Sequence, residues 1–133
     1  MGLDEFINQL PEDDDASINY ASLPELSRLT GPEAEEFGQL WLEWTPERVS
    51  EIVDRMVSLS EEQPDVEFES VFKQGISYPN SAVRVSSLKG LEESDDRALL
   101  KPLCAMLLDD PEVDVRAAAA IPLAYLCALS QVG

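Results

Sequence analysis

Apolar residues recur at helical spacing along most of this chain, with polar residues between them. Clear i, i+3, i+4, i+7 stripes are Phe37, Leu40, Trp41 and Trp44, and Val49, Ile52, Val53 and Met56; Phe68, Val71, Phe72 and Ile76 follow the related spacing i, i+3, i+4, i+8. Each stripe places its apolar side chains on one face of a helix, which then packs against a neighbour. No segment shows a convincing strand pattern, so the sequence predicts an all-α fold.

Residues that start and stop helices divide this pattern. We expect helices over residues 22–29, 31–44, 46–62, 68–76, 81–91, 95–108 and 111–129. The expected N-caps are Ser22, Thr45, Asn80 and Ser94, because their side chains accept hydrogen bonds from the first turn. Pro32, Pro46 and Pro111 suit the first helical position. The short loops between these helices favour antiparallel neighbours.

The first 21 residues are expected to be a lead-in to a helical domain over residues 22–133. Leu3, Phe6, Ile7 and Leu10 have the spacing of a short amphipathic helix. The acidic run over residues 12–15 lacks the ligand spacing, central Gly and final Glu of an EF-hand loop. We therefore interpret it as a solvated linker.

An internal repeat appears when the chain is shifted by 32 residues against itself. The shift superposes Pro79 on Pro111, Val83 on Val115, Arg84 on Arg116 and Leu91 on Leu123. The preceding helix follows the same shift, which places Phe68 on Leu100, Val71 on Leu103, Phe72 on Cys104 and Ile76 on Leu108. A shift of about 34 relates residues 37–49 to 71–83 more weakly. Two helices and their turn therefore repeat together, as in stacked helix-pair proteins.

The repeated segments resemble the HEAT repeat family, including its bacterial members of the PBS-lyase type. The run Asp110-Pro111-Glu112-Val113-Asp114-Val115-Arg116-Ala117 is similar to the family's Asp-Pro turn followed by Val-Arg and small residues. The resemblance covers residues 66–129 well and residues 33–60 weakly. It implies a right-handed α-solenoid of about three antiparallel helix pairs, HEAT- or armadillo-like.

The resemblance also implies a role for four charged residues near the turns. In the family such arginines and aspartates form a ladder between repeats, and here Arg84, Arg116, Asp110 and Asp114 hold those positions. We interpret them as structural and not as ligand-binding residues. A ladder of this kind stabilises modestly when exposed and more when desolvated.

Charge narrows the classes of partner. The 133 residues carry 27 acids and nine bases, a net charge of −18, with a pI near 4.1. Such a surface repels nucleic-acid backbones and anionic membranes. A basic protein partner, or solubility alone, fits better. The N-terminus lacks the basic start and apolar run of a signal peptide, so a soluble, cytoplasmic protein is expected.

The sequence contains few of the residues and motifs that enzymes use for catalysis. Histidine is absent, which removes the commonest general base and zinc ligand. No Gly-rich phosphate loop, GxSxG elbow or Cys-x-x-Cys pair occurs. Cys104 and Cys127 lie in apolar helical stretches, where we expect free thiols that pack as small hydrophobes. We expect no catalytic residues, no cofactor and no metal.

The function expected is a non-enzymatic scaffold or adaptor whose second helices line a concave face for a protein partner. The alternative is a subunit of an enzyme complex, such as a protein similar to phycobilin lyases. Trp41 is expected in the core, while Trp44 and Tyr78 are candidates for partner contact because aromatic residues are enriched at interfaces.

The last helix carries a further expectation. Residues 117–129 are apolar at every position, and a helix that is apolar all round is normally covered on several sides. We therefore expect either further repeats in the native chain or a homodimer through this helix, with Tyr125 and Leu129 in contact.

Overall fold

The computed structural model describes residues 3–8 and 20–132, which are mainly helical and contain no strand. The α-helices are α1 (Leu3–Asn8), α2 (Gly31–Leu40), α3 (Pro46–Glu62), α4 (Glu69–Gly75), α5 (Ser81–Gly90), α6 (Leu100–Asp109) and α7 (Val113–Val132). The 3-10 helices are η1 (Tyr20–Leu26), η2 (Trp41–Glu43) and η3 (Arg97–Leu99). The all-α prediction is confirmed. The acidic run over residues 12–15 lies outside the described residues.

Several helix starts lie where the capping residues predict them. Thr30 and Glu33 form a capping box at α2, in which each side chain bonds the other's backbone N–H. The Thr45 hydroxyl accepts a hydrogen bond from the third residue of α3, and the Asn80 side chain accepts two at the start of α5. These caps satisfy N–H groups that have no partner inside the helix.

Three predicted boundaries were wrong. The segment expected to be a helix over 22–29 is the 3-10 helix η1, which has Pro24 inside it and ends at Leu26. Asp96, not Ser94, caps the next element, because its carboxylate accepts from the Ala98 N–H. The last helix begins at Val113, since the residues before it form a bend closed by the Asp110 side chain.

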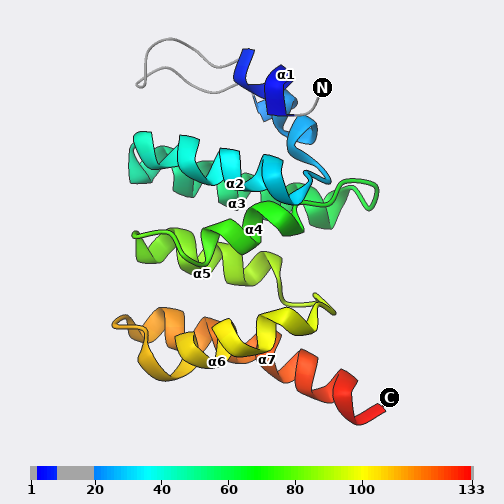
Figure 1. Cartoon of the computed structure of the whole chain (residues 1–133), viewed down its shortest axis with the longest axis vertical. Helices are drawn as coiled ribbons and strands as arrows, with labels where there is room; N and C mark the ends of the chain where they lie inside the picture. Colours follow the sequence, from blue (N-terminus) through cyan, green and yellow to red (C-terminus); the bar gives the residue numbers. More distant parts are fainter. Residues whose placement is uncertain (1–2, 9–19, 133) are drawn as a thin grey trace.

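The helices follow one another in pairs along the long axis, and α1 and α7 lie at opposite ends (Figure 1). One layer is formed by α3, α5 and α7, in which α5 packs between the other two. On the other side α2 packs on α4, while α4 packs on α5 and α6 on α7. At the first end α1 packs against η1, which also contacts α3.

The core runs through this stack and is richest in aromatic residues near its first end. Trp41 is 1% exposed, as predicted for a core residue, and its ring lies 4.9 Å from that of Phe37 and 5.5 Å from that of Tyr78. Phe6 of α1 is fully buried, with its ring 6.0 Å from Phe37. The short helix of the lead-in therefore shares the core of the helices that follow.

A glycine allows α4 and α5 to approach each other closely. A Cβ placed on Gly75 would overlap the Ser87 hydroxyl and lie 2.8 Å from the Ser87 Cβ. Only a residue without a side chain therefore fits at this contact.

Both thiols differ from the expectation. Cys104 and Cys127 are free, but they are exposed and not packed in the core. The apolar stretches that contain them are longer than the faces their helices bury, so half of each stretch remains at the surface. No helix among the described residues is long and apolar enough to cross a membrane.

Candidate functional site

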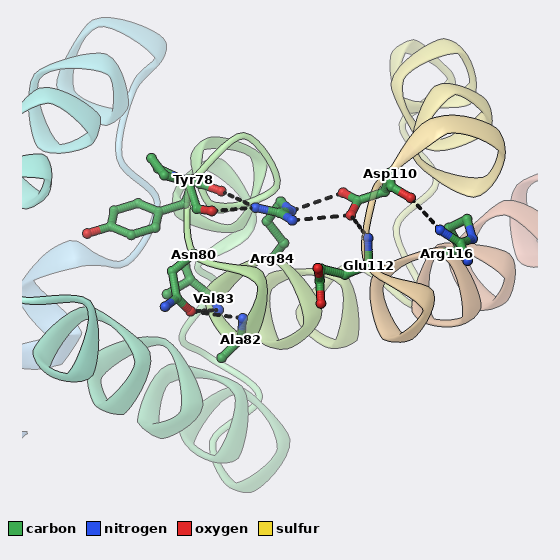
Figure 2. A network of polar contacts seen from close by, with 9 residues as sticks. Tyr78, Asn80, Ala82, Val83, Arg84, Asp110, Glu112 and Arg116 are labelled. Atoms are coloured by element: carbon green, nitrogen blue, oxygen red, sulfur yellow. Dashed lines mark hydrogen bonds and ion pairs between the residues drawn. The ribbon is translucent and has the colours of Figure 1, made fainter.

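The polar network between the last two helix pairs centres on Arg84 (Figure 2). Its Nε and Nη2 donate to the two carboxylate oxygens of Asp110, at 3.0 and 3.1 Å. Its Nη1 donates to the carbonyl oxygens of Tyr78 and Pro79, at 2.9 and 2.7 Å. The Arg84 and Asp110 side chains are only 12% and 8% exposed. This bidentate, desolvated geometry connects the start of α5 to the turn before α7.

The environment of Asp110 favours its charged form. Partial burial alone would raise its pKa, but the Glu112 backbone N–H and the Arg84 guanidinium together hold the pKa below its usual value. Arg116 adds to this effect by its charge, and its Nη1 donates to the Asp110 carbonyl oxygen at 2.6 Å. Asp110 therefore receives bonds on both its carboxylate and its main chain.

Of the four predicted ladder residues, Arg84, Arg116 and Asp110 come together, and Asp114 does not. Asp114 is exposed in the first turn of α7 and carries no described hydrogen bond or ion pair. A second ionic link, absent from the sequence reasoning, joins Lys73 of α4 to Glu69 and Asp96.

Asp96 and Lys73 each stabilise the other's charge. The hydrogen bond from Lys73, with that from the Ala98 N–H, lowers the pKa of Asp96. Burial alone would lower the pKa of Lys73, but the Asp96 and Glu69 carboxylates raise it. This link lies at the start of η3, so it also connects one helix pair to the next.

Trp44 and Tyr78 are not available for partner contact. They are 9% and 5% exposed, and the Tyr78 hydroxyl donates to the Trp41 carbonyl oxygen at 3.3 Å. Burial raises the pKa of Tyr78. Both rings belong to the aromatic core, because the Trp44 ring lies near those of Phe6 and Phe37 and the Tyr78 ring lies against that of Trp41. The interface interpretation of these two residues was wrong.

Tyr125 and Leu129, the other two candidates, lie on α7. Tyr125 is 37% exposed and Leu129 is half-buried. They are therefore placed where a second molecule could reach them, unlike the aromatic pair.

The hollows of the surface lie along α3 and α5. One, of about 550 Å³, is lined by the C-terminal ends of both helices and the loop after α5. Two others, of about 320 and 310 Å³, share Glu51 and Asp54. The first is lined by the middle of α3 alone, and the second extends to the N-terminal ends of α3 and α5. We call these three hollows the α3–α5 groove.

Acidic side chains dominate the α3–α5 groove. Its acids are Glu47, Glu51, Asp54, Glu61, Glu92 and Glu93, and its bases are Arg55 and Lys89. Asp54 accepts a hydrogen bond from the Ser86 hydroxyl across the groove. From the sequence, these acids were interpreted only as part of the polar helix faces and turns. Their signal was the i, i+4, i+7 spacing of residues 47, 51 and 54, which places three carboxylates on one face of α3.

The groove offers carboxylates that can accept hydrogen bonds and form ion pairs. Within residues 3–8 and 20–132, no group of three His, Cys, Asp or Glu side chains is arranged to hold a metal ion. The groove acids are exposed or half-buried. Such carboxylates suit ion pairs and hydrogen bonds with a cationic surface.

No protein-family model, curated protein or solved structure matches this chain.

Proposed function

We propose that this chain is a HEAT-like α-solenoid of about three helix pairs and acts as a non-enzymatic scaffold. Its α3–α5 groove binds a basic segment of another protein. The observation that carries the proposal is the groove itself, where six acids and two bases line three hollows along α3 and α5.

A recurring contact supports the solenoid part of the proposal. Arg84 bonds the carbonyl oxygen six residues before it, and Arg116 bonds the carbonyl oxygen six residues before it. The two donors are 32 residues apart, as are the two acceptors, so the contact follows the period of the sequence repeat. Repeated units that keep the same internal contact are what a solenoid requires.

The layer of α3, α5 and α7 supports the position of the binding surface. In HEAT-like stacks the second helices of successive pairs line the face that receives partners, and α3 and α5 hold that place here. Most of the residues that line the groove are charged or polar, which favours an extended or helical basic segment. A large apolar chromophore, as the lyase-like alternative would require, suits such walls poorly.

The test uses a synthetic Lys- and Arg-rich peptide of about 15 residues, followed by fluorescence anisotropy at several salt concentrations. We expect binding that weakens steeply with salt, because exposed charges are screened within about 10 Å at 0.1 M. Duplex DNA serves as the anionic comparison and should not bind.

A matched pair of variants separates the groove from bulk charge. Glu47→Lys with Glu61→Lys reverses two groove acids, and Glu35→Lys with Glu36→Lys reverses two exposed acids on α2. Both variants change the net charge equally. The groove variant should weaken peptide binding about tenfold or more, a difference of about 1.4 kcal/mol. Equal weakening by both variants would show that net charge alone attracts the peptide.

A further inference from the structure

Side chains at equivalent positions of the α4–α5 and α6–α7 pairs differ in their burial. Under the 32-residue shift, Ile76 corresponds to Leu108, and these are 8% and 74% exposed. Leu88 is fully buried in α5, whereas the corresponding Ala120 of α7 is exposed. The inner pair lies between two others, while the described residues cover α6–α7 on one side only. The uncovered side of α6–α7 is therefore equivalent to a surface that is buried in the α4–α5 pair.

This outer face holds most of the large apolar side chains left exposed. Of the five that the described residues leave exposed, four lie here, namely Leu108, Val113, Ile121 and Tyr125. Exposed alanines at 117 and 124 lie among them on α7 and allow another helix to approach closely. We call these six residues the outer face. A contiguous apolar patch exposed to solvent is typical of an interaction site.

Arg116 has an unused edge beside the outer face. Arg84 uses Nη1 for main-chain carbonyls and its Nε–Nη2 edge for the carboxylate of the next pair. Arg116 repeats the carbonyl contact through Nη1, and no described residue accepts a hydrogen bond from its Nε or Nη2. Arg84 binds the Asp110 carboxylate through Nε and Nη2. The same two atoms of Arg116 could bind a carboxylate in the same way.

The acids and bases of the α6–α7 pair are balanced in number, so the pairs of two copies of the chain can face each other without net repulsion. Residues 97–132 contain four acids and three bases, and one acid, Asp110, is already paired with Arg84. Three acids and three bases remain, whereas residues 1–64 contain 16 acids and three bases. Two chains that meet through α6–α7 therefore bring balanced charges together and keep their most acidic parts apart. Contact through the other end would oppose two strongly negative surfaces.

We propose that a second copy of this chain docks on the outer face, apolar surface against apolar surface. In the dimer an acid from the α6–α7 turn of one copy meets the open edge of Arg116 of the other. The exposed acids available for this contact are Asp109, Glu112 and Asp114. A 20-residue helix extends about 30 Å, so α6 and α7 together present a footprint of roughly 450 Å². That is below the roughly 800 Å² per partner of a standard interface, so association should be weak and dependent on concentration.

Analytical ultracentrifugation of the full chain is the direct test. The weight-average mass should rise from that of a monomer toward that of a dimer between about 1 and 500 µM. Ile121→Glu should weaken dimerisation about tenfold or more, since it places a charge in a desolvated contact. Leu42→Glu is the matched control, because Leu42 and Ile121 are exposed to 50% and 54% and only Ile121 lies on the outer face. The control should dimerise like the wild type.

Two further measurements keep the proposal falsifiable. Ala124→Glu, at an exposed position on the same face, tests the surface without removing a large apolar side chain, should Ile121→Glu fold poorly. A bifunctional maleimide should link wild-type chains through the exposed thiols Cys104 and Cys127, and the outer-face variants should abolish the link. A monomer at every concentration would overturn the proposal. So would a dimer that the outer-face variants leave intact, or one that Leu42→Glu weakens equally.

Discussion

Replacing Arg84 by Met should uncouple the last helix pair from the rest of the stack. The change removes the bidentate ion pair and two hydrogen bonds to carbonyls while keeping much of the apolar stem. It leaves the Asp110 carboxylate, only 8% exposed, without its cation. Breaking a buried pair from one side costs roughly 3–5 kcal/mol, and the residual exposure places this site near the lower value. We expect a loss of about 3 kcal/mol in the free energy of unfolding.

Urea denaturation followed by circular dichroism at neutral pH measures this loss, and thermal melting should show a fall in Tm of roughly 10 °C. Arg97→Met is the matched control, since Arg97 is exposed and its loss should cost under about 0.5 kcal/mol. Asp110→Asn completes a double-mutant cycle, in which the coupling with Arg84→Met should be about 1.5 kcal/mol or more.

Hydrogen exchange would locate the effect. Because each pair in a stack is stabilised by its neighbours, protection should fall first in α6 and α7. A loss under about 1 kcal/mol, or additive single-variant effects, would refute the view that this ion pair couples the two helix pairs.

Three further predictions concern pH, packing and capping. Because its folded-state pKa lies below the ordinary 3.8, Asp110 contributes stability that is present above that value and lost as pH falls through the folded pKa. The difference in unfolding free energy between wild type and Asp110→Asn should therefore be largest near pH 7 and disappear in acid. Urea denaturation at both pH values measures this difference, and an unchanged difference would show that the linkage is absent. Gly75→Ala should cost roughly 1–3 kcal/mol in chemical denaturation because its Cβ overlaps Ser87, whereas Gly31→Ala, with no atom within 4 Å of the new Cβ, should be nearly neutral. Asn80→Ala should cost about 1 kcal/mol by removing the cap of α5, and Asn80→Asp, which keeps an accepting oxygen, should recover most of the loss.

Local signals predicted the helical elements well and the short connecting elements poorly. The stripes and the caps Thr45 and Asn80 lie within the segment they act on, so their effect can be read from the sequence. The 3-10 helix η1 was predicted as a regular helix because Ser22 suits an N-cap, but Pro24 lies inside the element. Asp96 caps η3 and also accepts a hydrogen bond from Lys73 of α4, a contact between distant parts of the chain that the local sequence does not reveal.

The candidate sites divide in the same way. Arg84 and Arg116 could be paired from the 32-residue repeat, because helices that repeat in the sequence also repeat in space once they stack. Asp110 was named only through the resemblance to the HEAT repeat family. The spacing of Glu47, Glu51 and Asp54 places them on one helix face, but the sequence does not show that this face lines a groove, since that depends on which helices become neighbours. Trp44 and Tyr78 were misassigned for the related reason that an aromatic side chain suits a core and an interface equally.

The sequence alone therefore determined that this chain is helical, that its last two helix pairs repeat with a 32-residue period, and that its net charge is strongly negative. These properties follow from local spacing, capping and composition. Only the tertiary structure decided which apolar side chains are covered, because burial depends on a neighbour and not on the residue itself. Ile76 and Leu108 hold equivalent positions in the repeat, yet one is buried and the other exposed. The α4–α5 pair packs against α2 and α3 on one side and against α7 on the other, whereas the α6–α7 pair packs against α5 on one side only among the described residues.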